Sequence, residues 1–152
     1  MTHSDREPCK GEEGQITVLI IGYILVSLLV VAVVTAVSAV YIEHKKLLSV
    51  ADGAALSAAD SFRVSGIDAE AGEPAPTLDS GSVAGAAEAY LERSGAAARF
   101  NSLSLDPATG ATDPRTARVV LTAVVHPPLV NFLVPSGIPI AATADARADL
   151  TR

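Results

Sequence analysis

The dominant hydrophobic pattern in this chain is a long apolar run from Ile16 to Ile42 that contains no charged side chain. A helix needs about 20 apolar residues to cross the hydrocarbon core of a bilayer, and this run exceeds that length. In water the run would expose apolar surface all the way round, and the rest of the 152-residue chain is too small to bury it. The run therefore predicts a transmembrane anchor.

A helical pattern continues beyond the anchor. Apolar side chains recur at intervals of three and four residues and form one stripe: Leu48, Ala51, Ala55, Ala58 and Phe62. No proline occurs between Pro8 and Pro74. The sequence thus predicts one continuous helix from about Gln15 to about Phe62, about 70 Å long at 1.5 Å per residue.

Small residues occur in both halves of this helix. Within the anchor, Ala32 and Ala36 have a spacing that favours helix association in lipid, although a generally alanine-rich sequence would show the same pairs. In the second half, small side chains would let a sheet approach closely. The predicted helix-packing face comprises Ala32, Ala36, Leu48, Ala51, Ala55, Ala58 and Phe62.

Two segments follow the long helix. Residues 63–82 are rich in glycine, proline and acidic residues without an apolar period, which predicts a linker. Val83–Ala98 has an apolar face and predicts a second helix, with Gly95 marking or approaching its end.

The remainder of the chain shows the alternation of strands. Asp106–Asp113 has strong turn chemistry, and Pro127 and Pro128 end the best of the strand patterns. Leu129–Val134 is a short apolar segment that we expect to pack onto the sheet or the membrane. The predicted strands are Arg99–Leu105, Thr116–His126 and Ile138–Leu150.

The predicted fold class is α+β. A polar leader (1–14) precedes the transmembrane helix and its amphipathic extension (15–62), a linker (63–82) and a small extracytoplasmic head (83–152) with one short helix and an antiparallel sheet of about three strands. So few strands are marginally stable alone. We therefore expect the small-residue half of the first helix to cover one face of the sheet.

Composition narrows the range of functions. The net charge is −6 and the charges are scattered, which disfavours a nucleic-acid surface. Aromatic residues make up 4% of the chain and tryptophan is absent, so the core must be built from Ala, Val and Leu. Cys9 is the lone cysteine, which excludes an intrachain disulfide.

The anchor differs from a cleaved signal peptide because the apolar region of a signal peptide spans only about 7–15 residues. A cleavage site can be argued at Val37–Ala39, but it lies beyond a stretch that already spans the membrane. Two basic residues flank each end of the anchor, so the positive-inside rule does not decide the orientation. The short leader favours a cytoplasmic N-terminus and an exported head.

No catalytic motif is evident. The sequence contains no metalloprotease, phosphate-loop, dithiol or serine-hydrolase signature, which predicts a protein that is not an enzyme and binds no cofactor or metal. His3, His44 and His126 are far apart in sequence. We interpret His44 as an interfacial residue at the membrane exit, and Asp52 and Asp60 as solvated or capping carboxylates.

Three stretches resemble the TadE/TadG-like group of the tight-adherence (Tad, or Flp) pilus system. These are the junction and anchor (12–43), the helix just after the membrane (45–60), and, more weakly, the ending around a proline-bounded loop (122–150). The resemblance implies a pilin-like, single-pass membrane protein of a pilus-assembly or secretion apparatus. It also implies partners among the other membrane proteins of that apparatus, with self-association and lipid contact, and neither nucleic acid nor a small-molecule substrate.

The resemblance also identifies a candidate processing junction. In the pilin-like group a peptidase cuts after a glycine that precedes the apolar run, and Gly14 occupies that place with Gln15 as the new first residue. A processed pilin usually carries a glutamate at its fifth position, where this chain has Leu19. This departure favours an accessory component over a major fibre subunit.

An anchored binding module for a ligand or cell-wall polymer is the alternative function. Such a module needs a pocket lined by aromatic or convergent polar groups. Beyond the long helix the aromatic residues are few: Tyr90, Phe100 and Phe132.

Overall fold

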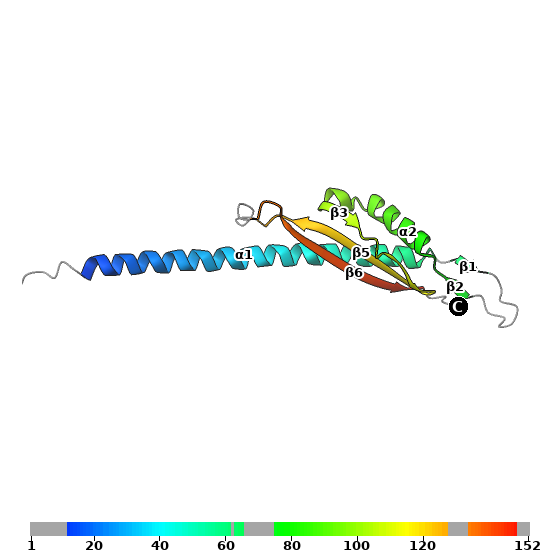
Figure 1. Ribbon diagram of the computed structural model, residues 1–152, viewed down its shortest axis with the longest axis horizontal. Coiled ribbons are helices and arrows are strands. Elements are labelled where there is room, and N and C mark those ends of the chain that lie inside the picture. Colours follow the sequence, from blue (N-terminus) through cyan, green and yellow to red (C-terminus); the bar gives the residue numbers. More distant parts are fainter. Residues whose placement is uncertain (1–11, 62, 66–74, 128–133, 149–152) are drawn as a thin grey trace, which may run out of the picture.

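The computed structural model describes residues 12–61, 63–65, 75–127 and 134–148. Helix α1 (Glu12–Ala59) is the longest element. Its first half projects from the rest of the molecule, and its second half lies against a small domain formed by the elements that follow it (Figure 1). This domain is called the head from here on. The predicted α+β class with a long N-terminal helix is confirmed.

The predicted continuity of α1 is also confirmed, because the helix runs through 48 residues without a break. It begins at Glu12, a few residues before the expected Gln15, and ends at Ala59. Its last turn is extended by a bond from the Asp60 amide to the Leu56 carbonyl (3.1 Å). Phe62, the expected end of the helix, lies outside the described residues.

The segment expected to be a linker contains regular structure. Strand β1 (Arg63–Ser65) pairs antiparallel with β2 (Ala75–Thr77), and helix α2 (Ser80–Arg93) begins before residue 82. The side chain of Asp79 caps α2 by accepting the amides of Gly81 and Ser82 at 3.0 and 3.2 Å. Strands of three residues are too short to show a period of two, so the pattern did not reveal them.

Helix α2 ends earlier than the predicted Ala98. It stops at Arg93, and Gly95 then adopts a left-handed conformation (φ 62°) before the 3₁₀ turn η1 (Ala96–Ala98). Glycine takes this conformation without the steric cost that a Cβ would add. Gly95 therefore marks the end of the helix, and the three alanines beyond it form a separate turn.

The main sheet is built around strand β5 (Thr116–Val125). Strand β6 (Ile138–Arg147) pairs antiparallel with β5 over its whole length, from Thr116 opposite Arg147 to Val125 opposite Ile138. Strands β3 (Asn101–Leu105) and β4 (Gly110–Asp113) both pair with β5. Their partners lie in opposite halves of β5, so the sheet is three strands wide although it has four strands. The fourth, β4, lies in the segment expected to be only a turn.

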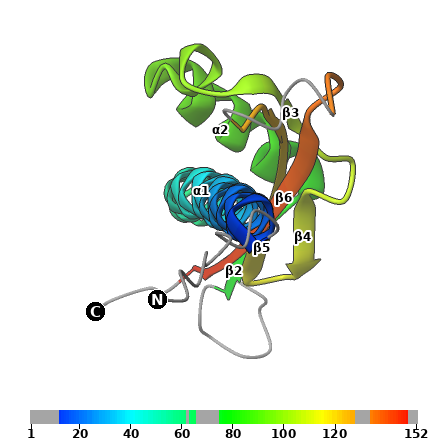
Figure 2. The same ribbon diagram turned by 90° about the vertical axis from the view of Figure 1, so that its left-hand side faces the viewer.

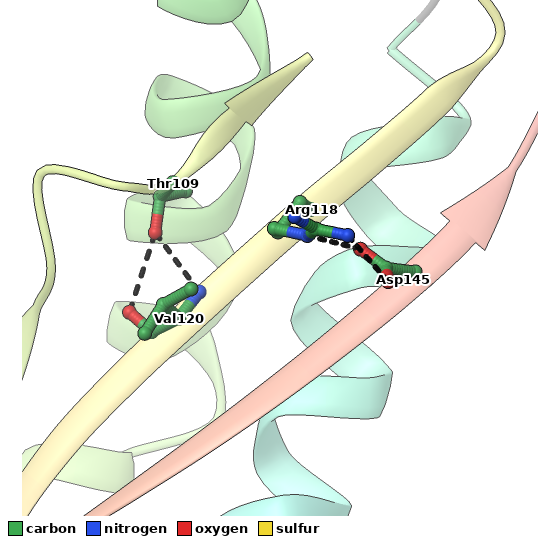
Figure 3. A network of polar contacts seen from close by, with 4 residues as sticks. All are labelled: Thr109, Arg118, Val120 and Asp145. Atoms are coloured by element: carbon green, nitrogen blue, oxygen red, sulfur yellow. Dashed lines mark hydrogen bonds and ion pairs between the residues drawn. The ribbon is translucent and has the colours of Figure 1, made fainter. Parts of the chain in front are cut away.

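Thr109 bridges the gap between β3 and β4. Its hydroxyl accepts the Val120 amide (3.0 Å) and donates to the Val120 carbonyl (3.3 Å), as Figure 3 shows. The Asp106 amide also donates to that carbonyl at 2.9 Å. The side chain thus satisfies the Val120 amide in the gap between β3 and β4, where a neighbouring strand would otherwise supply a backbone carbonyl.

Strand β3 contains an irregularity that changes which side chains face inward. Strict alternation over the predicted strand Arg99–Leu105 would put Phe100 on the opposite face from Leu103 and Leu105, but all three contact the same core. Ser102 has a positive φ (52°), and the pairing register shifts between Asn101 and Ser104. The bulge lets Phe100 be buried while both leucines pack against the same core.

The two faces of the sheet differ. Helices α1 and α2 cover one face (Figure 2), and the inward side chains of β5 and β6 alternate as predicted, with Val119, Leu121, Ala142 and Ala144 all buried. The other face carries all the polar side chains of β5 and β6, interspersed with apolar ones. There Arg118 and Asp145, directly opposite in register, form a two-bond ion pair at 2.8 and 3.1 Å (Figure 3). This hydrogen bonding lowers the pKa of the Asp145 carboxyl.

Replacing Thr109 tests whether its hydroxyl stabilises β5 in the gap between β3 and β4. Thr109→Val should lower the free energy of unfolding by about 1–3 kcal/mol because it leaves the Val120 amide without a partner on this edge. Thr109→Ser keeps the hydroxyl and should lower the free energy of unfolding by a clearly smaller amount. Unfolding in detergent followed by circular dichroism measures both variants, and equal losses would show that the hydroxyl contributes nothing.

Candidate functional site

The first half of α1 is an apolar surface that the rest of the molecule leaves uncovered. The uncharged stretch from Gly14 to Ile42 is called the shaft. Its large side chains stand well exposed, including Leu25 (61%) and Val37 (64%). Helix α1 is long and apolar enough to span a membrane, and the qualifying window is not buried by the rest of the described structure. One long apolar helix of this kind fits a single-pass membrane anchor.

The second half of α1 is buried by the head of the same chain. It contacts β6, β5 and α2, and one face of it contributes to the hydrophobic core. The buried residues of α1 are Leu47, Val50, Ala51, Ala54, Ala55, Ala58 and Ala59. Most of them are alanines, so the helix axis can lie close to the sheet.

The buried stripe overlaps the helix-packing face expected from the sequence but is rotated from it. Ala51, Ala55 and Ala58 lie in the core, whereas Leu48 is only partly buried at its border. Leu47, wholly buried, takes the place expected for Leu48. Leu47, Val50 and Ala54 were not among the predicted residues. They also recur at three- and four-residue spacing, but this spacing does not distinguish their stripe from the neighbouring one through Leu48.

Gly53 allows α1 and α2 to meet. A Cβ built at this position would lie 2.1 Å from the Tyr90 hydroxyl and 2.6 Å from its ring carbon Cζ. The tyrosine ring therefore occupies the space that a side chain at position 53 would need. This close approach positions α2 beside the helix that bears the anchor.

The base of the head contacts the C-terminal end of the shaft. The region where α1 residues 36–44 meet the base of the head is called the neck. Here the His44 Nε2 atom lies 3.1 Å from the Ala141 carbonyl oxygen of β6. Beside this contact is a groove of about 430 Å³ whose lining surface is wholly apolar. It is lined by Ala36, Val37, Val40, Tyr41, His44, Ile138 and Ile140.

A second hollow of about 370 Å³ lies on another flank of the neck. It combines apolar residues of the shaft with polar groups of the head. Its lining residues are Ala39, Ile42, Glu43, Arg99, Phe100, Asn101, Val124, Val125 and His126. His44 and His126, far apart in sequence, thus both lie at the neck, but each lines a different hollow.

Charged residues surround the neck just beyond the shaft. Lys46 pairs with Glu43 at 2.7 Å, and the Lys45 ammonium lies 5.6 Å from the centre of the Tyr41 ring. Aromatic and basic residues are enriched where helices leave a membrane, because they suit the headgroup layer. The neck therefore has the chemistry of a membrane–water interface.

Of the remaining predicted residues, Ala36 lies at the neck and the others lie on the shaft away from it. Gly14 and Gln15 lie in the first turns of α1 and are exposed, and Ala32 lies on the shaft. Ala36 lines the apolar groove. Among the described residues, no group of three or more His, Cys, Asp or Glu side chains could hold a metal ion.

A family model described as Flp pilus-assembly TadE/G-like matches residues 14–61. The match covers about a third of the chain and coincides with the shaft and the buried half of α1. No curated protein and no solved structure matches the chain.

Two leucines of nearly equal exposure test the assignment of the shaft as a membrane anchor. Leu28 (60% exposed) lies in the shaft, and Leu56 (62%) lies in the second half of α1. Leu28→Arg should destabilise membrane insertion by about 3–4 kcal/mol, because leucine favours insertion at the centre of a spanning helix and arginine opposes it. Leu56→Arg should leave the protein in the membrane fraction.

Alkaline extraction of membranes followed by immunoblotting measures the distribution of both variants. The assignment would be wrong if both variants remained in the membrane equally, or if both were lost.

Proposed function

We propose that this chain, whose residues 14–61 match the TadE/G-like family model, is a pilin-like structural or accessory component of a Tad/Flp-type pilus-assembly or secretion apparatus. The observation that carries the proposal is the extent of the match. It includes both the apolar shaft and the alanine-rich face on which the head is built. The part of the chain that resembles the family is therefore also the part that organises this structure.

The proposed mechanism is mechanical. Because α1 passes without a break from the shaft into the core of the head, the anchor and the head move as one body. A neighbouring membrane protein that tilts or shifts the shaft would move the head with it. The surfaces left for partners are the shaft itself, with Ala32, and the face of the sheet that carries Arg118 and Asp145.

An accessory role is proposed rather than that of the main fibre subunit. The shaft holds Leu19 where a processed pilin has the glutamate that pairs with a neighbouring subunit. A carboxylate placed in lipid needs such a partner to offset its desolvation cost. Without the carboxylate this chain lacks the charge pairing that positions pilin subunits along a fibre.

We further propose that the leader stays uncleaved in the cytoplasm and that the head is exported. Cys9, the single cysteine, precedes the shaft, and exposed Asp60 follows it, so thiol labelling can report on both ends. A membrane-impermeant maleimide applied to intact cells (to spheroplasts if an outer membrane blocks access) should label Asp60→Cys in a Cys9→Ser background. Cys9 of the wild type should be labelled only after lysis.

Three results would contradict this proposal. Labelling of Cys9 in intact cells would reverse the orientation. A mature N-terminus at Gln15 by mass spectrometry, with Cys9 absent from the membrane protein even after lysis, would show pilin-type maturation. A start near residue 40 would mean that the head is released.

Deletion and complementation test the role in the pilus system. Removing the gene should strongly reduce surface pili counted by electron microscopy, and the wild-type gene supplied in trans should restore them. Leu56→Arg should restore pili as well, whereas Leu28→Arg should not, because that variant is expected to lose its anchor. Normal pili and normal secretion in the deletion strain would overturn the proposed function.

A further inference from the structure

The uncharged part of α1 is longer than the hydrocarbon core of a bilayer. From Gly14 to Ile42 the helix extends about 44 Å at 1.5 Å per residue. A bilayer is about 30 Å thick across its hydrocarbon and about 40–45 Å thick with its interfacial layers. If the shaft spans the membrane, its last two turns therefore lie at the depth of the upper acyl chains and headgroups.

Those two turns are the ones that the head touches. The start of β6 supplies Ile138 and Ile140, and α1 supplies Ala36, Val37 and Val40, to a single groove. His44 bonds to the Ala141 carbonyl at the same place, which holds β6 against the helix. The base of the head is thus fixed at the depth of the interfacial layer and cannot rise above it without breaking this contact.

From this geometry we propose that the apolar groove between α1 and β6 binds an acyl chain of a membrane phospholipid, with the lipid phosphate near Lys45. The proposal rests on the membrane anchoring included in the proposed function. The groove wall on α1 is continuous with the surface of the shaft, so a chain can enter it directly from the surrounding lipid. Its volume of about 430 Å³ lies in the range of small-molecule sites.

The charges beside the groove favour a lipid over a second copy of the chain. Lys45 lies over Tyr41, a groove residue, and makes no ion pair with any residue that the structure describes. An ammonium at this level suits the phosphate of a lipid. A second copy inserted in the same direction would bring its own Lys45 to the same depth, and like charges placed together oppose association.

Introduced tryptophans test the proposal cleanly because the chain has none of its own. Three single-tryptophan variants of the full chain are reconstituted at high dilution into vesicles of phosphatidylcholine brominated in the upper half of its chains. Ile138→Trp reports on the groove and Val33→Trp on the shaft. Thr143→Trp, exposed on β6 about 17 Å further along the strand, reports on the head above the membrane.

Fluorescence is compared with that in unbrominated vesicles. We expect tryptophan fluorescence to be at least twofold lower in the brominated vesicles for Ile138→Trp and Val33→Trp. For Thr143→Trp we expect little change in fluorescence. If Ile138→Trp matches Thr143→Trp while Val33→Trp is quenched, the shaft is in lipid but the groove is not, and the lipid proposal fails while the proposed function stands. If Val33→Trp is also unquenched, the anchoring itself is wrong.

A second copy in the groove would give another result. Ile138→Trp would then be shielded from bromine, and the shielding would increase with the protein-to-lipid ratio, which also overturns the proposal. Should Ile138→Trp fail to fold by circular dichroism, Val134→Trp offers an exposed position at the same end of the sheet. It should be quenched if the base of the head lies among the lipids, and its lack of quenching would count against the proposal.

Discussion

The close approach of α1 to the sheet is the interaction on which the rest of this structure depends. Ala51, Ala54, Ala55 and Ala58 are each almost wholly excluded from water, and the inward positions of β6 are also mostly alanine. Alanine combines the highest helix propensity with a small side chain, so it keeps α1 straight and still lets the sheet come near. Larger side chains at the same positions would force the two layers apart, because a packed core does not accept added volume without strain.

This arrangement gives one helix two environments. The shaft turns apolar surface outward on all sides, and the second half turns a single face inward with polar residues such as Asp52 and Asp60 outside. The change occurs at the neck, within about two turns, where charges reappear in the sequence. Since α1 is unbroken between the two halves, the sheet is held at a defined distance from the shaft.

Much of the fold could be predicted because its signals are local. The run from Ile16 to Ile42, the alternation in β5 and β6 and the absence of proline in α1 are all readable residue by residue. What escaped prediction depends on partners distant in sequence. Strand β4 forms only because β5 offers an edge to it, and the bulge at Ser102 appears only when β3 is paired with that same edge.

The sequence by itself determined that the chain has an apolar helix of membrane-spanning length, an amphipathic continuation and a small sheet, because hydrophobic period and proline placement act within each segment. The tertiary structure alone decided that Leu47 rather than Leu48 lies at the centre of the packing face, since the rotation of a helix is set by what it packs against. It also decided that Ile138 and Ile140 lie beside Ala36 and Val40. These residues are about a hundred positions apart. Strand β5 runs back toward the neck, and β6 starts there and runs beside α1 in the same direction, which brings them together (Figure 1).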